Sequence, residues 1–170
     1  MSNYSVVRLD DIKSRHVGRN YSVRVPVGKT LENGNVAKVL KREVNNLDVH
    51  TIEEATAGDS VILIAEVALV YDNNRIGTGL EKNFIMKEGE VVRGYELAVH
   101  DLVSVSLEGF ATEPAEGDII VPNGFKLDKG PAPATGTYFE VVKIEQVGGW
   151  LTINTTQTPT KYAVMEVKQV

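Results

Sequence analysis

The sequence contains no cysteine and few aromatic residues, and both absences restrict how the chain is stabilised and what chemistry it performs. The lack of cysteine excludes disulfides, thiolate metal sites and a cysteine nucleophile together. Only 6% of the 170 residues are aromatic, whereas 42% are hydrophobic and 24% are charged, as in an ordinary folded chain. We therefore expect a folded protein whose stability comes from packing and strand pairing.

The sequence also lacks a long hydrophobic run and an excess of positive charge. The longest apolar stretch, residues 61–70, is interrupted by Glu66 and is too short to cross a bilayer. The start, MSNYSVVRLDD, does not have the basic and then apolar pattern of a secretion signal. The formal charge of −5 argues against a dedicated nucleic-acid binder, because such proteins place Lys and Arg against phosphates. We expect a soluble protein made in the cytoplasm, with neither a membrane nor a nucleic acid as partner.

No arrangement of residues indicates catalysis. His16, His50 and His100 are isolated in sequence, without the nearby ligands that characterise most zinc sites. The acidic pairs Asp10-Asp11 and Glu53-Glu54 are interpreted as solvated surface, because general acid–base chemistry needs a carboxyl group in an apolar pocket. The sequence has no Gly-x-Ser-x-Gly motif. We predict that the protein is not an enzyme and uses no metal and no cofactor.

One tripeptide, Gly28-Lys29-Thr30, matches the end of a phosphate-binding loop. The complete loop needs a glycine five positions earlier, where this sequence has Val23. The residues that follow include Asn33-Gly34, a strong tight-turn signal, instead of the start of a helix. The sequence therefore predicts turns here and not a nucleotide site.

The chain changes character near residue 20. Residues 1–20 combine a short apolar run with a polar, basic stretch that has no helical or strand period, which is typical of an extended arm that orders against a partner. Residues 21–170 consist of short β-rich runs separated by Gly, Pro, Asn and Asp. We therefore predict a mainly β fold, an antiparallel β-sandwich or barrel with an extended N-terminal arm and little helix.

Two segments give the clearest strand signals. Residues 60–65, SVILIA, are apolar at both alternating sets of positions, which predicts a strand covered from both sides in the middle of the core. Val103, Val105 and Leu107 alternate with polar residues, which predicts a strand with one buried face. His100-Asp101 interrupts the alternation before this strand and indicates a turn or bulge.

Other segments carry weaker signals. Residues 36–44 fit a strand or a short amphipathic helix, and residues 52–55 indicate a short helical turn. Further strands are expected at residues 95–99, 119–121, 138–144, 150–153 and 162–167.

One longer stretch resembles a known family. Residues 83–97, NFIMKEGEVVRGYEL, are followed by HDLVSVS at residues 100–106. Together they resemble a pattern of small head decoration (capsid cement) proteins of tailed bacteriophages. Residues 31–36 and the β-rich residues 61–71, which are followed by Asp72, resemble earlier blocks of the same family. The likeness therefore spans roughly residues 28–147. It implies a structural protein on the virion surface that binds and reinforces the major capsid shell, and it supplies no active site.

The resemblance directs attention to specific residues. Arg93 and Tyr95 lie in the matched segment, where the simpler interpretation is a charge at a strand edge and an aromatic residue of the core. We select five candidate contacts with the major capsid protein, and possible contacts between copies on the capsid lattice: Arg8, Arg15, Arg19, Arg93 and Tyr95. Two alternative functions remain open. One is a phage tail-tube or tail-tip protein, and the other is a small-ligand or glycan-binding β-barrel with a pocket lined by tyrosines.

Overall fold

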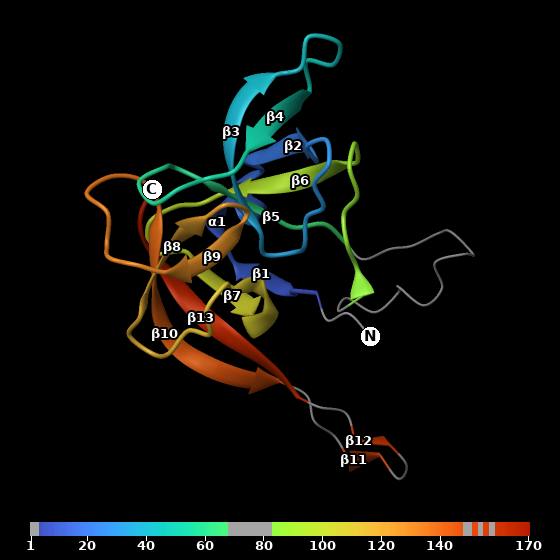
Figure 1. The fold of residues 1–170 in the computed structure, drawn as a ribbon. Coiled ribbons are helices and arrows are strands. Elements are labelled where there is room, and N and C mark those ends of the chain that lie inside the picture. The colour runs from blue at the N-terminus through green and yellow to red at the C-terminus, as the bar shows by residue number, and fades with distance from the viewer. Residues whose placement is uncertain (1–3, 68–82, 148–150, 153–154, 157–158) are drawn as a thin grey trace.

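The computed structural model describes residues 4–67, 83–147, 151–152, 155–156 and 159–170 (Figure 1). The fold is mainly β, with 50% strand and 6% helix, and it combines an antiparallel sheet with a closed barrel. The predicted fold class is therefore confirmed.

The elements follow one another in short runs, as the sequence pattern indicates. The helical elements are α1 (Lys13–Val17) and the 3-10 helix η3 (Leu107–Gly109). The strands are β1 (Val7–Asp11), β2 (Asn20–Arg24), β3 (Val36–Arg42), β4 (Val49–Glu53), β5 (Ile62–Ile64), β6 (Val91–Glu96), β7 (Leu102–Ser106), β8 (Ile119–Asn123), β9 (Lys126–Lys129), β10 (Tyr138–Val147), β11 (Leu151–Thr152), β12 (Thr155–Thr156) and β13 (Thr160–Gln169).

The strands form two main assemblies. Six strands make one antiparallel sheet in the order β1-β7-β13-β10-β8-β9, so β1 lies at an edge. Five strands close a barrel in the order β2-β4-β3-β5-β6, in which β2 and β4 pair in parallel. In Figure 1 the barrel lies above the sheet, and the end of the β3–β4 hairpin projects from the barrel on the side away from the sheet. β11 and β12 form a separate two-stranded pair.

Strand β5 belongs to two hydrophobic cores at once. Ile62 and Ile64 point into the barrel, whereas Leu63 packs in the core between the barrel and the six-stranded sheet. This follows from the alternation of side chains along a strand. The prediction that residues 60–65 form a strand covered from both sides, in the middle of the core, is confirmed.

Side chains fill the interior of the barrel. Leu31, Ile64 and Met86 are among the fully buried residues that meet there. Gly94 of β6 faces the same interior, and a Cβ added at this position would lie 2.3 Å from Cδ1 of Ile62. Glycine at position 94 therefore leaves room for the Ile62 side chain inside the barrel. In the described part of the barrel, packed side chains occupy the place where a tyrosine-lined ligand pocket would lie.

Residues 4–20, which we expected to form an extended arm, are packed into the fold. β1 pairs antiparallel with β7, with Val7 opposite Val105. Ile12 is fully buried in the core between barrel and sheet. α1 then ends at Gly18, whose φ of 71° is the left-handed conformation that favours glycine. The apolar residues of this segment are irregularly spaced because strand, bulge and helix follow one another within a few residues.

The turn predicted at Asn33-Gly34 is confirmed. Gly34 has a φ of 90°, and the Asn35 N–H donates to the Glu32 carbonyl at 3.1 Å. The Asn33 side chain accepts from the Glu66 N–H at 2.8 Å and donates to the Glu66 carbonyl at 3.0 Å. The turn is thereby tied to the chain just after β5.

The turn predicted around Gly28-Lys29 is also present. Gly28 has a φ of 73°, and the Lys29 N–H donates to the Pro26 carbonyl at 3.2 Å. The Lys29 ammonium pairs with the Glu54 carboxylate at 2.6 Å, so this lysine already has an anionic partner. The turn at His100-Asp101 is confirmed as well, with His100 at a φ of 73°.

Three details differ from the predictions or extend beyond them. The helical turn expected at residues 52–55 is wrong, because Ile52 belongs to β4 and pairs with Val39 of β3. Residues 36–42 form a strand, which decides between the two possibilities for that segment. β7 ends at Ser106, so Leu107, expected in this strand, lies in η3. Ser106 is buried, and its hydroxyl accepts the Val6 N–H at 3.0 Å. The ends of the expected segments at residues 61–71 and 150–153 lie outside the described residues.

Candidate functional site

A surface hollow of about 430 Å³ runs beside β1 and contains most of the candidate contact residues. Four successive residues of β1 line it, namely Val7, Arg8, Leu9 and Asp10. Successive side chains of a strand point to opposite faces, so a hollow that meets all four follows the backbone edge of the strand. We call it the edge groove. Its complete lining is Val7, Arg8, Leu9, Asp10, Arg15, Asn20, Val67, Arg93 and Tyr95.

The opposite wall of the edge groove comes from the barrel. Arg93 and Tyr95 lie on β6, and Asn20 of β2 pairs with Tyr95 in the antiparallel register. Arg15 reaches the groove from α1. The docking of β1 on the sheet therefore brings arginines from the start of the chain close to residues of the matched segment.

Four of the five candidate contacts line the edge groove, and the fifth lies elsewhere. Arg19 lines a separate hollow of about 250 Å³ and pairs with Glu96 at 3.4 Å. Its side chain is 71% exposed. The structure thus brings together Arg8, Arg15, Arg93 and Tyr95 and separates Arg19 from them.

Positive charge exceeds negative charge among the residues that line the groove. Arg15 pairs with Asp10 at 3.1 Å, and Arg8 lies 3.9 Å from the same carboxylate. Arg8 is also 3.8 Å from Glu145 and lies over the ring of Tyr162 at 6.0 Å. Both arginine side chains remain about half exposed, at 46% and 50%. Two guanidinium groups therefore share one lining carboxylate and stay accessible.

Arg93 is held by Tyr95 in the same groove. The side-chain hydrogen bond with Tyr95, together with the charge of Glu66, raises the pKa of Arg93. The Tyr95 ring is 7% exposed and belongs to the core between barrel and sheet. Tyr95 is therefore a core aromatic residue that interacts with the Arg93 guanidinium.

The backbone of β1 presents hydrogen-bonding groups to the groove. The Ser106 N–H donates to the Val6 carbonyl at 2.8 Å, which makes Val6 and Ser106 a hydrogen-bonded pair. Such pairs alternate along an antiparallel ladder, so the N–H and C=O of Val7 point away from β7, on the edge of the sheet that the groove follows. The register shifts between Arg8 and Asp11, and this bulge limits the pairing edge to a short length.

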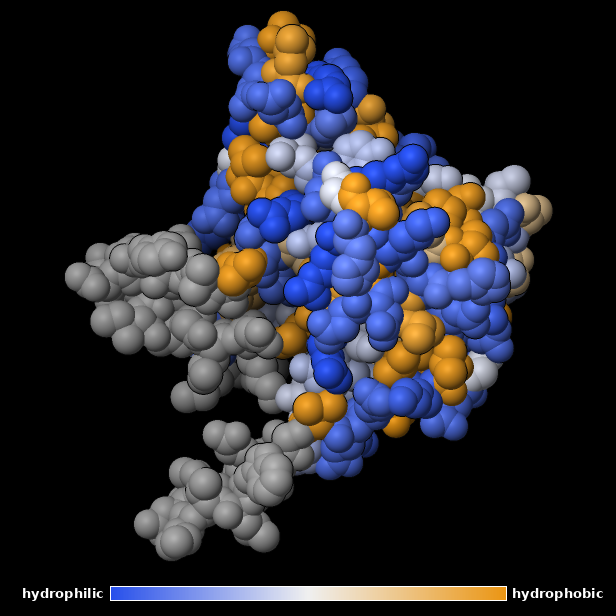
Figure 2. Space-filling model, turned by 180° about the vertical axis from the view of Figure 1, so that it is seen from behind, coloured by the Kyte–Doolittle hydropathy of each residue, from blue (hydrophilic) through white to orange (hydrophobic). Residues whose placement is uncertain are grey.

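A second exposed surface lies at the end of the β3–β4 hairpin. We call residues 43–48 the hairpin tip; it projects from the barrel in Figure 1. Val44 is 89% exposed and Leu47 is 66% exposed. Figure 2 shows hydrophobic side chains gathered at this projecting end. Val44 and Leu47 therefore form a small apolar surface at the end of the hairpin.

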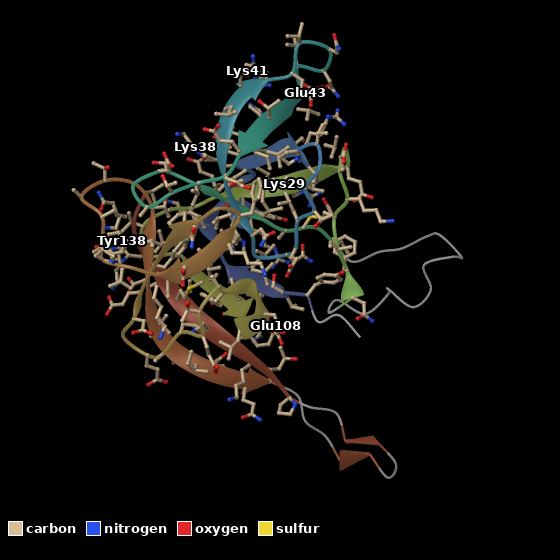
Figure 3. The ribbon with its side chains drawn as sticks, in the orientation of Figure 1. Lys29, Lys38, Lys41, Glu43, Glu108 and Tyr138 are labelled. Carbon is tan, nitrogen blue, oxygen red and sulfur yellow. The ribbon has the colours of Figure 1, made fainter. Side chains whose placement is uncertain are left out.

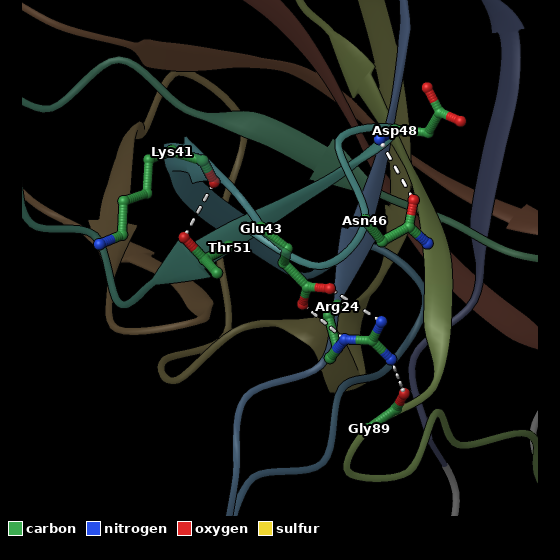
Figure 4. A network of polar contacts seen from close by, with 7 residues as sticks. All are labelled: Arg24, Lys41, Glu43, Asn46, Asp48, Thr51 and Gly89. Atoms are coloured by element: carbon green, nitrogen blue, oxygen red, sulfur yellow. Dashed lines mark hydrogen bonds and ion pairs between the residues drawn. The ribbon is translucent and has the colours of Figure 1, made fainter.

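The hairpin tip is braced by polar contacts at its base. Arg24 of β2 donates to both carboxylate oxygens of Glu43 and to the Gly89 carbonyl (Figure 4). The hydrogen bond from Arg24 is the main reason that the pKa of Glu43 is lowered. The Thr51 hydroxyl donates to the Lys41 carbonyl at 3.0 Å across the hairpin. These contacts hold the tip in a defined orientation.

The outer side of β3 is charged. Figure 3 shows Lys38 and Lys41 along this strand and Glu43 just beyond its end. Lys38 pairs with Asp59 at 2.9 Å and with Glu53 at 3.7 Å. Sequence reasoning did not select the hairpin tip, although Asn45-Asn46 between Val44 and Leu47 is a turn signal flanked by apolar residues.

Among the described residues, no three His, Cys, Asp or Glu side chains come together in a way that could hold a metal ion. None of the described helices has the length and apolar character needed to span a membrane.

No protein-family model matches the sequence. No curated protein and no solved structure matches the chain either.

Proposed function

We propose that this chain is a non-enzymatic structural protein of a phage virion, which binds the outer surface of the major capsid shell and stabilises it. The observation that supports this best is the convergence of Arg8, Arg15, Arg93 and Tyr95 on one open groove. These residues were selected from sequence as partner contacts, and they come from β1, α1 and β6. The resemblance of residues 83–106 to head decoration proteins supplies the identity of the partner.

The form of the surface is suited to a binding protein that works on a lattice. The edge groove offers main-chain and guanidinium groups, and the hairpin tip offers apolar side chains on a braced support. A contact repeated over many capsid subunits gives high avidity even when each contact is modest. Because the edge groove and the hairpin tip belong to one folded body, the second contact costs less entropy once the first has formed.

Binding to shells tests the proposal directly. The purified protein is mixed with expanded shells of the phage that encodes it, and the sediment is assayed for both components. We expect co-sedimentation and higher resistance of the shells to heat or to a chelator. The proposal fails if the intact protein does not bind expanded shells, or if it assembles alone into rings or tubes visible by negative-stain microscopy.

A matched set of arginine variants tests the location of the contact. Arg15→Glu and Arg93→Glu place a negative charge in the edge groove, and we expect each to weaken shell binding by about tenfold or more. Arg19→Glu makes the same chemical change outside the groove and serves as the control. Equal loss of binding in all three variants would contradict a contact at the groove.

A further inference from the structure

We infer that the edge groove binds a short, extended and acidic peptide segment of its partner. The inference rests on the proposed function for the identity of the partner, but the chemistry of the bound segment follows from the groove itself. Shape, main-chain groups and charge each contribute to it.

The shape of the groove fits a single extended chain. The groove follows β1 along four successive residues and is closed on the other side by β6 and α1. The N–H and C=O of Val7 point away from β7, at the strand edge that the groove follows. A partner segment that pairs with these groups becomes an additional strand at the edge of the six-stranded sheet.

The charges of the groove favour carboxylates on that segment. Arg8, Arg15 and Arg93 line the groove, and Asp10 is the acidic residue among its described lining residues. Among the described residues no carboxylate lies within ion-pair distance of Arg93, and Tyr95 and the more distant Glu66 are the groups that raise its pKa. A positioned guanidinium binds a carboxylate through two parallel hydrogen bonds, which a lysine ammonium does not do.

The surroundings of the groove disfavour a polyanion. Asp10 lies inside the groove, while Glu66 acts on Arg93 and Glu145 lies 3.8 Å from Arg8. The chain as a whole carries a formal charge of −5. A nucleic acid would place a phosphate near each of these carboxylates, whereas a peptide places single carboxylates opposite single arginines.

The bulge in β1 sets the length of the bound segment. Pairing is interrupted between Arg8 and Asp11, and the Ile12 N–H donates to the Leu9 carbonyl at 3.5 Å. The main chain beyond Val7 therefore offers few free groups to a partner strand. The contact is short, and the arginines supply much of its affinity and most of its specificity.

A synthetic peptide tests this inference on the intact protein. The probe is a short fluorescent peptide in which glutamate alternates with valine or threonine, and fluorescence anisotropy reports its binding. We expect binding that weakens as salt is added, because the arginines are exposed. We expect Arg15→Ala and Arg93→Ala each to weaken binding about tenfold, since hydrogen bonds to charged groups are being removed. Arg19→Ala, the matched control, should bind as the wild type does.

Three variations of the probe make the test decisive. Replacing glutamate by glutamine should weaken binding about tenfold, and methylating the backbone nitrogens should weaken it while leaving the charges intact. The inference is overturned if the glutamine peptide binds equally well, if methylation has no effect, or if a single-stranded oligonucleotide binds more tightly. NMR shifts on binding should centre on Val7, and shifts confined to residues outside the groove would also overturn it.

The two proposals fail in different ways. Peptide binding at the groove without any binding to shells refutes the capsid function and supports the chemistry of the groove. Shell binding that survives both arginine variants, together with no peptide binding, refutes the groove and leaves the function intact. Circular dichroism and the thermal midpoint of each variant confirm that a lost interaction does not reflect a lost fold.

Discussion

Arg24 on β2 and Glu43 beyond the end of β3 form a two-point pair, with Nε to Oε1 at 2.5 Å and Nη2 to Oε2 at 2.9 Å. The remaining Nη1 donates to the Gly89 carbonyl at 2.7 Å. One guanidinium therefore joins the base of the projecting hairpin to the barrel and to the turn before β6. The planar fork of arginine matches the carboxylate, so replacement by lysine does not preserve the contact.

Removing this brace should loosen the hairpin tip without unfolding the protein. In Arg24→Ala we expect faster amide hydrogen exchange over residues 43–49, where the Glu43 N–H donates to the Val49 carbonyl at 2.8 Å. The midpoint of global unfolding should change little, because the pair lies near the surface, with side chains 37% and 18% exposed, and ion pairs near the surface contribute little. Exchange mass spectrometry measures the effect, with Arg19→Ala as the control for loss of an arginine. Unchanged exchange at the tip would show that Arg24 does not restrain it.

Charged substitutions at the hairpin tip should separate binding from stability. Val44→Asp and Leu47→Asp alter side chains that are 89% and 66% exposed, so the free energy of unfolding should stay within about 0.5 kcal/mol of the wild type. Shell binding should weaken by about tenfold or more if the tip enters an apolar contact, because a charge would then be buried. Val27→Asp, at a position 84% exposed outside the tip, is the matched control. Equal binding by all three variants would exclude the tip from the contact.

A methyl group at Gly94 should destabilise the barrel. The added Cβ would lie 2.3 Å from Cδ1 of Ile62, a residue that is 5% exposed and has little room to move. We expect Gly94→Ala to lower the free energy of unfolding by about 1–3 kcal/mol, measured by urea denaturation.

A second substitution shows whether the steric contact is the cause. Ile62→Val removes the Cδ1 atom, so Gly94→Ala combined with Ile62→Val should lose less stability than the sum of the single changes. Gly117→Ala is a useful comparison, because its φ is 82° but no atom lies within 4 Å of an added Cβ. Additive effects of the Gly94 and Ile62 changes would show that the contact with Cδ1 of Ile62 does not cause the loss of stability.

Asp59 should make part of the stability dependent on pH. The Thr56 N–H, the Lys38 ammonium and the Thr56 hydroxyl lower the pKa of Asp59 to about 2. A carboxyl group whose pKa is lower in the folded protein stabilises it above the unfolded pKa of about 4, and this contribution is lost as the pH falls toward the folded value. Discounted for solvent screening, we expect about 1 kcal/mol at neutral pH.

Comparison with Asp59→Asn isolates that contribution. Urea denaturation of both proteins should give a difference that is constant above about pH 5, shrinks below about pH 4 and vanishes near pH 2. A difference that does not depend on pH would mean that the amide loses hydrogen-bonding geometry and that charge plays no part.

The features that were predicted from sequence are those encoded within a few neighbouring residues. The apolar run at residues 60–65 specifies a strand covered on both faces, and Asn33-Gly34 specifies a tight turn. The helical turn expected at residues 52–55 was wrong because pairing of Ile52 with Val39 determines its conformation, and that contact is not local. Local propensity is a weak guide where such tertiary pairing competes with it.

The edge groove depends on contacts that a single sequence does not display. Arg8 and Arg93 line the same groove because β1 pairs with β7, which follows it in the chain by more than ninety residues. The burial of Ile12 is equally hidden, since its neighbours in the core come from distant strands. Selecting the arginines individually was feasible from sequence, whereas recognising that four of the selected residues form one surface required the topology of the sheet.

The position of β5 has a mechanical consequence. Its three residues, Ile62 to Ile64, pack alternately in the barrel core and in the core between the barrel and the six-stranded sheet. Neither the barrel nor the sheet can therefore shift without disrupting the packing of the other. A load applied at the projecting end would pass through this strand to the far side of the molecule. The protein should then behave as a rigid body that keeps its binding surfaces at a fixed separation. Under load, its contacts with a partner should dissociate before its own fold deforms.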